Sequence, residues 1–409
     1  MKKIIFIFSV ILFFGCSTFE VKNDLSALDL DYDSLSPELM ETDLPVINIT
    51  VDPNEFEDMF ERIEEEIEID GYFRMYRNQE LVIDDKEVEI ELKGNFSKQF
   101  DLKSLGIKFE KKYDNSSRKL INPPVILPHH NLDKIKAIRL RNSGNDFKRT
   151  MLKDLSYTQL AIQTGMDLDL TYGEQSIVFI NEKFYGLLNL RTESNAHGVA
   201  GLHGSKKSEV TLGKMETQSL VKKDGDFERI DNLVEAVNSK DLDYLKNEID
   251  INNFIDYLVF QTYISNTDWP HTNARFYAIR DSKFRFVIFD LDSANRFDLK
   301  RSPISLIDKR AKNFISDLFF VLYEDSDFRT QFWNKYQYIL SQNLMSKTTF
   351  KSFVHSNLEK IKTEMQFNIQ KYNIPESKIE WLIEVDKMIQ MFEERDNNIG
   401  NLVTQEIEG

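Results

Sequence analysis

Two short stretches decide how this chain is interpreted: residues 266–273 read NTDWPHTN, and residues 290–292 read DLD. The apolar pattern of residues 252–264 predicts a buried helix, which would place Asp268 in the loop that follows it. A hairpin is predicted over residues 274–289, and its second strand would end at the DLD stretch. The order of these elements predicts that a loop carboxylate, an amide and a pair of strand-end carboxylates lie close together.

This set of polar groups suits phosphoryl transfer. The reaction needs a carboxylate that orients the acceptor hydroxyl, and it needs oxygen ligands that hold Mg²⁺ or Mn²⁺ against the phosphates. Asp268, Asn273, Asp290 and Asp292 supply groups of these kinds. Protein kinases carry a loop aspartate, an asparagine five residues later, a short hairpin and a metal-binding aspartate in the same order. The pattern therefore predicts a metal-dependent phosphotransferase site.

A purely local explanation of the same residues is also open. Asp268 and Asn273 would then cap a turn, and Asp290 would end a strand, because Asp and Asn favour turns. Two features argue against this explanation. The apolar strand at residues 286–289 would deliver an aspartate from a buried position, which is costly unless a cation or a donor meets it. Asp290 and Asp292 would also share one face of the chain, where their repulsion favours a bound cation.

The composition excludes several other classes of protein. The chain has 409 residues, of which 41% are hydrophobic, and this is enough for a large packed core and rules out a disordered chain. The single cysteine can form neither an internal disulfide nor a thiolate zinc cage. The net charge of −16 argues against nucleic acid as a partner, because a phosphate backbone needs a cationic face.

The N-terminus has the pattern of a bacterial lipoprotein signal peptide. Two lysines precede an apolar run over residues 4–14, which is too short for a permanent membrane helix, and Gly15 comes directly before Cys16. We predict that residues 1–15 are removed and that Cys16 is lipidated. The acidic residues 16–44 would then form a flexible tether, and the lipid would anchor the protein to a membrane of the bacterial cell envelope.

The remaining chain divides into two parts. Residues 45–300 alternate between short strand patterns and helix patterns, which predicts an α+β core with mixed or antiparallel sheets. Residues 301–409 carry apolar and aromatic stripes at helical spacing, which predicts a helical C-terminal region. The predicted site therefore lies near the end of the core.

Further motifs extend the pattern over much of the chain. Residues 92–97 read LKGNFS, residues 103–109 KSLGIKF, residues 142–146 NSGND and residues 179–186 FINEKFYG. Together with the two stretches at the predicted site, these motifs make the chain similar to the CotH-like kinase family, the atypical protein kinases named after spore-coat protein H. The likeness covers residues 45–297, with the motifs in the right order.

The resemblance implies an atypical two-lobed protein-kinase-like core that binds ATP with Mg²⁺ or Mn²⁺ and phosphorylates Ser or Thr residues of a protein. Asp268 resembles the catalytic base of that family. Asn273 and Asp290 resemble its metal ligands, and Asp292 is a second or alternative ligand.

The same resemblance suggests residues that bind the cofactor. Lys103 or Lys108 would be the phosphate-binding lysine, and their odd spacing places at most one of them on a given face of a strand. Lys103 is slightly preferred. Glu193 would pair with that lysine, and Arg149 would steady the phosphates. An equally open explanation is that both lysines extend along a strand edge and that Glu193 forms a surface ion pair.

Two positions depart from the pattern of the family. Lys93 stands where an arginine is usual, which keeps the charge but loses bidentate geometry. Residues 293–296 read SANR in place of the usual aromatic-glycine ending. We therefore carry two hypotheses. One is an envelope-anchored kinase that phosphorylates Ser or Thr hydroxyls of a protein. The other is a surface lipoprotein that keeps the kinase-like fold without catalysis and acts in binding or in envelope or coat assembly.

Overall fold

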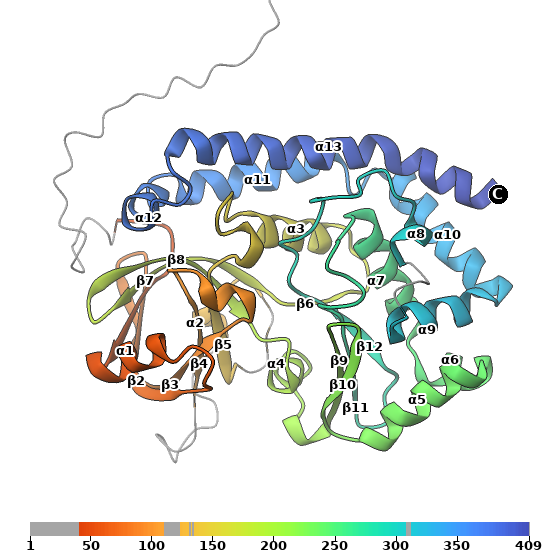
Figure 1. The fold of residues 1–409 in the computed structure, drawn as a ribbon, viewed down its shortest axis with the longest axis horizontal. Helices are drawn as coiled ribbons and strands as arrows, with labels where there is room; N and C mark the ends of the chain where they lie inside the picture. Colours follow the sequence, from red (N-terminus) through yellow and green to blue (C-terminus); the bar gives the residue numbers. More distant parts are fainter. Residues whose placement is uncertain (1–40, 110–122, 131, 133–134, 308–311, 409) are drawn as a thin grey trace, which may run out of the picture. The chain divides into compact units, whose positions relative to one another are not determined.

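The computed structural model describes residues 41–109, 123–130, 132, 135–307 and 312–408. The predicted signal peptide, Cys16 and all but the last residues of the predicted tether lie outside the described residues, so these expectations stay predictions. The described part has an α+β fold, as the sequence predicts, with two sheets and a set of C-terminal helices (Figure 1).

The first sheet is a closed barrel, in which the described strands follow the order β1-β2-β3-β4-β5-β8-β7. Neighbouring strands are antiparallel except for β1 and β7, whose parallel pairing closes the barrel. Burial alternates along β2 because successive side chains of a strand point to opposite faces. The strands of the barrel are β1 (Val46–Val51), β2 (Glu68–Arg77), β3 (Glu80–Lys93), β4 (Ser104–Lys108), β5 (Ala137–Arg141), β7 (Gly173–Ile180) and β8 (Lys183–Thr192).

The second sheet has the order β10-β9-β11-β12-β6 among the described strands. The hairpin predicted from the sequence is present as β11 and β12, with Arg275 opposite Val287. Helix α7 (Ile251–Tyr263) packs against β12 and is buried nearly all round, which explains why most of its residues are apolar. The strands of this sheet are β6 (Asp169–Leu170), β9 (Val210–Glu216), β10 (Ser219–Asp224), β11 (Arg275–Ile279) and β12 (Arg285–Ile288).

The helices before the hairpin connect and cover the two sheets. Helix α1 begins at the predicted cap, where Asp52 Oδ1 accepts hydrogen bonds from the backbone N–H groups of Asn54 and Glu55. Helix α3 follows β5 and begins next to the candidate site. Besides α7, these helices are α1 (Pro53–Glu61), α2 (Pro123–Ile126), α3 (Lys153–Gln163), α4 (Ala196–Leu202), α5 (Phe227–Ser239) and α6 (Leu242–Glu248).

The C-terminal helices pack back onto the core, and Figure 1 shows α11 and α13 at the top of the view above α3. Trp381 Nε1 donates a hydrogen bond to the carbonyl of Thr150 at 2.8 Å. The buried guanidinium of Arg395 donates to the carbonyls of Thr262 and Tyr263 at 2.7 and 2.9 Å. None of the described helices is both long and apolar enough to cross a bilayer. These helices are α8 (Pro303–Ile307), α9 (Phe314–Tyr323), α10 (Ser326–Ser341), α11 (Lys347–Ile361), α12 (Met365–Tyr372) and α13 (Lys378–Glu408).

Candidate active site

The candidate site lies where the ends of two strands and two loops meet. Strand β5 ends at Arg141 and leads through residues 142–152 into α3. Helix α7 leads into the loop that carries Asp268, and β12 ends at Ile288, two residues before Asp290. The site is therefore built from segments that are distant in the sequence.

Asp268 and Asp292 are joined by two side chains that reach both of them. Ser293 Oγ donates a hydrogen bond to Asp268 Oδ2 at 2.6 Å and lies 3.2 Å from Asp292 Oδ1. Asn145 Nδ2 lies 3.3 Å from Asp268 Oδ2 and 3.2 Å from Asp292 Oδ1. The backbone N–H of Asn145 also donates to Asp292 Oδ2 at 2.9 Å. The predicted loop carboxylate and one of the predicted strand-end carboxylates are therefore neighbours.

Asp290 and Asp292 are bridged by one guanidinium group. Arg141 Nη2 donates to Asp290 Oδ1 and to Asp292 Oδ2, the latter at 2.5 Å. Arg141 Nε lies 3.7 Å from Asp154 Oδ2 on α3, and the Arg141 side chain is 12% exposed. Burial opposes the charge of Arg141, but the neighbouring carboxylates outweigh it and raise the pKa. The guanidinium therefore stays charged and holds the two aspartates together.

Gly144 makes room for this bridge. Its φ of +55° lies in the left-handed region, and a Cβ built on it would overlap Asp292 Oδ2 and Arg141 Nη2. The preceding Ser143 also has a positive φ, of 70°. The backbone at residues 143–145 is therefore shaped so that both a guanidinium group and the N–H of Asn145 reach Asp292.

The pKa values of Asp290 and Asp292 are shifted in opposite directions. Burial and the charge of Asp290 raise the pKa of Asp292 to about 8. Burial also opposes the charge of Asp290, but the charge and hydrogen bond of Arg141 outweigh it and hold the pKa of Asp290 below its usual range. Arg141 therefore favours the charged form of Asp290, and burial beside that charge favours the protonated form of Asp292.

Asn273 lies on the same hairpin as Asp290. The paired part of this hairpin ends with Arg275 opposite Val287, and Asn273 and Asp290 lie just beyond that pair. Asn273 and Asp290 have positive φ values of 52° and 59°, a conformation that Asn and Asp tolerate better than most residues. Two of the predicted metal ligands therefore lie at the same end of one hairpin, Asn273 two residues before β11 and Asp290 two residues after β12.

The donor atoms at the site are the hard oxygens that Mg²⁺ and Mn²⁺ prefer. Burial first and the charge of Asp290 second raise the pKa of Asp292, and a dication at this place would favour the charged form of both carboxylates. The chemistry of Asn273, Asp290 and Asp292 therefore fits a divalent ion. Within the described chain, no three side chains of His, Cys, Asp or Glu are grouped to hold a metal ion by themselves, so the amide and a phosphate ligand would have to complete the shell.

The two candidate phosphate-binding lysines are bonded to other groups. Lys103 Nζ donates to the carbonyls of Lys98 and Phe100 at 2.7 and 3.0 Å, and burial lowers its pKa. Lys108 Nζ pairs with a cluster of carboxylates on β2 and β3, and its pKa is raised because these pairs outweigh its burial. The carboxylates around Lys108 are those of Glu68, Glu89 and Glu91. A phosphate-binding role for either lysine stays a prediction.

Glu193 pairs with an arginine. Arg139 donates to Glu193 through Nη2 at 2.9 Å and through Nε at 3.2 Å. Burial opposes the charge of Glu193, but the charges of Arg139 and Lys93 outweigh it and lower the pKa. Burial and the nearby charge of Arg139 also lower the pKa of Arg275 to about 10. The charge of Arg139 also lowers the pKa of Asp290. The cations around Glu193 therefore influence the carboxylate pair too, and such a group of cations is suited to an anionic ligand.

A cavity of about 510 Å³ opens beside Glu193, on the side of the barrel. Lys93, Lys108, Lys136 and Asn195 are among the residues that line it. Sites for small molecules usually have volumes of roughly 300–1,000 Å³. The cavity is therefore large enough for a nucleotide.

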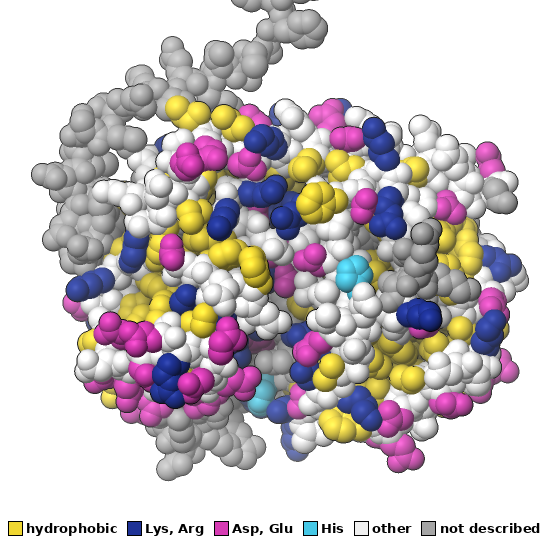
Figure 2. Space-filling model, in the orientation of Figure 1, with side chains coloured by type: hydrophobic (Ala, Val, Ile, Leu, Met, Phe, Trp, Pro, Cys, Tyr) yellow, Lys and Arg dark blue, Asp and Glu magenta, His cyan; other side chains and the backbone are white. Residues whose placement is uncertain are grey.

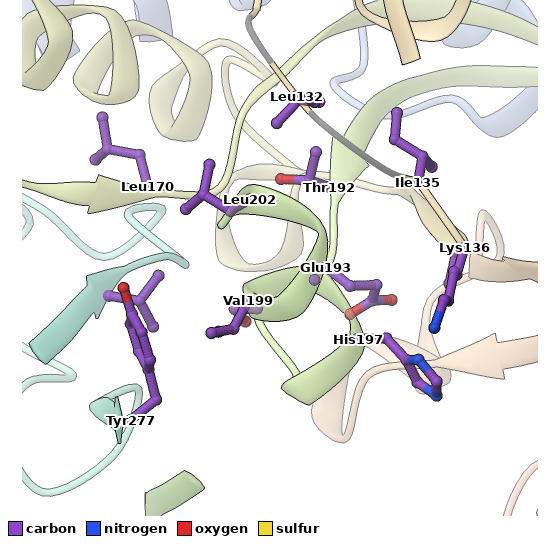
Figure 3. Close-up of a pocket in the computed structure, with 14 residues that line it drawn as sticks. Leu132, Ile135, Lys136, Leu170, Thr192, Glu193, His197, Val199, Leu202 and Tyr277 are labelled. Atoms are coloured by element: carbon purple, nitrogen blue, oxygen red, sulfur yellow. The ribbon is translucent and has the colours of Figure 1, made fainter. Parts of the chain in front are cut away.

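Figure 3 shows a smaller, mostly apolar pocket next to this cavity, with Leu170, Val199 and Leu202 among its lining residues. Glu193 and His197 line both spaces. The volume of the smaller pocket is about 20 Å³, which is room for about one water molecule. It is therefore too small for a nucleotide base.

Arg149 lies at another opening of the site, a groove of about 540 Å³ that also contains Asn145. The described residues that line this groove differ from those that line the cavity beside Glu193. Because Asn145 reaches both Asp268 and Asp292, the groove leads to these two carboxylates.

Sequence reasoning missed the groups that join the aspartates. Arg139 and Arg141 are two residues apart on one strand, so their side chains share a face, and this spacing was the available signal. Asn145 lies in the NSGND motif, and Ser293 begins the SANR stretch that departs from the family. Neither residue carries a charge or a spacing that points to Asp268, so nothing local to the sequence identifies them.

The fold and the site define a class of protein. A loop aspartate after a buried helix, followed by a hairpin that ends in a carboxylate pair, is the arrangement of a kinase-like protein. The family model described as CotH kinase protein matches residues 90–399, so the chain belongs to the CotH kinase family and the resemblance seen in the sequence is confirmed. The match runs through the C-terminal helices, well past residue 297, where the sequence motifs end. A search of the curated proteins found no match to the chain.

Proposed function

We propose that this protein is an atypical kinase that transfers the γ-phosphoryl group of ATP to Ser or Thr hydroxyls of a protein, using Mg²⁺ or Mn²⁺. The observation that carries the proposal is the linkage of the three aspartates. Asp268 and Asp292 share two bonding partners, and Asp292 and Asp290 share Arg141. The linkage joins Arg141 at the end of a barrel strand to aspartates that follow a strand of the second sheet. It therefore supports the predicted two-lobed core, in which the barrel is one lobe and the second sheet with its helices is the other.

Asp268 is suited to accept the proton of the acceptor. Its Oδ2 is held by Ser293 and Asn145, whereas no described residue donates a hydrogen bond to its Oδ1. In the proposed reaction the acceptor oxygen bonds to the γ-phosphorus of ATP, and the bond from that phosphorus to the β–γ bridging oxygen breaks. The hydroxyl proton passes to Asp268 Oδ1, and ADP leaves.

The remaining residues would position the phosphates. A divalent ion held by Asn273, Asp290 and Asp292 would neutralise the phosphate charge. Arg139, which bonds Glu193 and whose charge lowers the pKa of Asp290, would donate to phosphate oxygens. The cavity beside Glu193 would take the nucleoside, because its volume of about 510 Å³ suits a ligand of that size.

We also propose that a lipid on Cys16 holds the mature protein at the bacterial cell envelope. The support for this proposal is the order of a basic start, a short apolar run, Gly15 and Cys16. Two or more acyl chains on one cysteine would anchor the protein stably, because each chain adds its own burial in the membrane. The acceptor would then be a protein of the same compartment.

Thermal unfolding tests nucleotide binding. ATP with Mg²⁺ at about one hundred times Kd should raise the free energy of unfolding by roughly 2.7 kcal/mol. For a protein of this size the corresponding rise in Tm is roughly 3–4 °C. Asp290→Asn should abolish the metal-dependent part of this shift, whereas Asp281→Asn, in the exposed turn of the same hairpin, should keep it. A wild-type chain with no metal-dependent shift for ATP, GTP or other nucleotides would remove the basis of the proposal.

Labelled ATP with Mn²⁺ tests the transfer step. The wild-type chain should label itself or a Ser-rich acceptor protein. Asp268→Asn should keep the nucleotide-dependent thermal shift and reduce the labelling by about a hundredfold or more, because general base catalysis contributes about that much. Equal labelling by this variant would exclude Asp268 as the base.

One observation favours the second candidate, a binding protein of the same fold without catalysis. Arg141 contacts both Asp290 and Asp292, so a side chain of the protein already neutralises the carboxylates that would bind metal. Such a protein would show no metal-dependent thermal shift with any nucleotide. Asp290→Asn would then lower its stability, by leaving Arg141 with less compensation, and would have no nucleotide effect.

A further inference from the structure

A groove next to the candidate site carries an excess of positive charge, in a chain whose net charge is −16. We call it the basic groove. Its volume is about 540 Å³. Figure 2 shows Lys and Arg side chains gathered on the face just beneath the position that α13 has in Figure 1. Its charged residues are four cations and two carboxylates: Lys148, Arg149, Arg296, Lys387, Glu380 and Glu384.

The carboxylates of the basic groove do not balance its cations. Glu384 Oε1 accepts a hydrogen bond from Lys387 Nζ at 2.6 Å, so these two charges compensate each other. Glu380 Oε2 accepts from the backbone N–H of Glu376 at 2.8 Å. The other three cations form no ion pair with any carboxylate of the described chain. Three cations are therefore opposed by one carboxylate.

Aromatic rings, rather than acids, hold two of these cations in place. Lys148 Nζ lies 5.4 Å from the ring centre of Phe100, and the guanidinium of Arg296 lies 5.1 Å from the ring centre of Phe297. Arg296 Nε is also buried and has no hydrogen-bond partner among the described residues. Contacts of this kind orient a cation and leave its charge available to an external anion.

The basic groove ends at the candidate base. Asn145 lines it, and the amide of this residue lies 3.3 Å from Asp268 Oδ2. In-line transfer needs the acceptor and the leaving nucleotide on opposite sides of the transferred group. The cavity beside Glu193 is proposed to take the nucleoside, so the basic groove, which has a different lining, remains for the acceptor.

We propose that the basic groove binds the acceptor polypeptide and selects Ser or Thr residues that are flanked by Asp or Glu. This proposal rests on the proposed kinase function and adds the class of acceptor to it. Carboxylates of the acceptor would pair with Lys148, Arg149 and Arg296, while the hydroxyl residue reaches Asp268. Phe96, which is 70% exposed at the edge of the groove, would cover an apolar part of the peptide.

Fluorescence anisotropy without nucleotide tests binding by the full chain. Two fluorescein-labelled peptides are compared, each with a central serine that is flanked on both sides by three aspartates or by three lysines. The aspartate peptide should bind at least about tenfold tighter, and its affinity should fall with added salt. Lys148→Glu and Arg149→Glu should each weaken its binding by about tenfold. Lys183→Glu, at the far end of β8, should leave the affinity unchanged.

The outcomes separate this proposal from the kinase function. Equal affinity for the two peptides, or unchanged affinity in Lys148→Glu and Arg149→Glu, would overturn the proposal. Loss of the ATP-dependent thermal shift in these variants would assign the cations to the nucleotide and overturn it as well. A chain that binds the aspartate peptide without transferring phosphate keeps the groove and refutes the kinase. A chain that phosphorylates both peptides equally keeps the kinase and refutes the groove.

Discussion

Replacing Gly144 by alanine adds one methyl group at the point where Arg141 meets Asp292. Gly144 has a φ of +55°, and the new Cβ would overlap both the carboxylate and the guanidinium, so at least one of them has to move. Gly165 has a φ of +65° and no described atom within 4 Å of the same Cβ position. Gly165→Ala is therefore a matched control, because it introduces the backbone strain without the overlap.

The two variants should differ by the cost of separating the ion pair. Alanine in the left-handed conformation costs roughly 1–2 kcal/mol, which is the full effect expected for Gly165→Ala. Removing one partner of a buried ion pair costs roughly 3–5 kcal/mol. Because Arg141 and Asp292 would be displaced rather than removed, we expect about half of that cost in addition. Gly144→Ala should therefore lower the free energy of unfolding by about 3–4 kcal/mol.

Unfolding by urea or heat measures this difference of about 2 kcal/mol, which corresponds to roughly 2–3 °C in Tm for a protein of this size. The thermal shift with ATP and Mg²⁺ should also be smaller in Gly144→Ala and unchanged in Gly165→Ala, because Asp292 is a proposed ligand. If both variants lose the same stability and keep the same shift, Gly144 does not make room for the bridge and the reasoning fails.

The raised pKa of Asp292 makes stability depend on pH. Its folded value of about 8 exceeds the ordinary value of about 3.9, so its contribution to stability is fully present below about pH 4 and is lost as the pH rises through about 8. Asp292→Asn should flatten the pH profile of the free energy of unfolding across this range, and an unchanged slope would contradict a buried proton. Ser293→Ala removes a donor to Asp268 and should cost about 1–2 kcal/mol and slow phosphate labelling about tenfold, whereas an unaffected rate would show that Ser293 does not hold the base. Cys16→Ser should move the protein from the membrane fraction to the supernatant, and unchanged fractionation would refute the lipid anchor.

Local patterns were sufficient for the elements around the site. The helix predicted over residues 252–264 is α7, and the predicted hairpin is β11 and β12, because burial on every side and alternation are both visible in the sequence. The closed barrel could not be predicted. Its closure depends on the parallel pairing of β1 with β7, two strands that lie far apart in the chain and carry no local signal of that pairing.

The roles of the lysines show why spacing alone does not identify a binding residue. Lys108 lies directly opposite Glu89 in the pairing of β4 with β3, so its ammonium group meets carboxylates of neighbouring strands. Lys103 comes just before β4, where its ammonium group reaches backbone carbonyls. The register between strands decides which groups surround a side chain, and a single sequence does not contain it. Asp268 and Asp292 could be anticipated because both follow directly from the helix and the hairpin.

The positive and the negative charges of the site come from different sheets of the fold. Strand β5 of the barrel provides Arg139 and Arg141, and the hairpin of the second sheet leads to Asp290 and Asp292. Without a ligand, Arg141 pairs with both aspartates and Arg139 pairs with Glu193. ATP alone would compete with the aspartates for the arginines, and a metal ion alone would leave Arg141 buried without compensation, at a cost of roughly 3–5 kcal/mol.

ATP together with a metal ion carries negative and positive charge. It would therefore compensate the arginines and the aspartates at once. We therefore expect positive coupling, in which each ligand lowers the Kd of the other by the same factor, as thermodynamic linkage requires. Arg141→Met should weaken this coupling, because the carboxylates would then be free to bind metal without displacing a cation. Titrations of ATP at several fixed Mg²⁺ concentrations measure the factor. A Kd for ATP that does not change with Mg²⁺ would contradict the exchange of partners at this site.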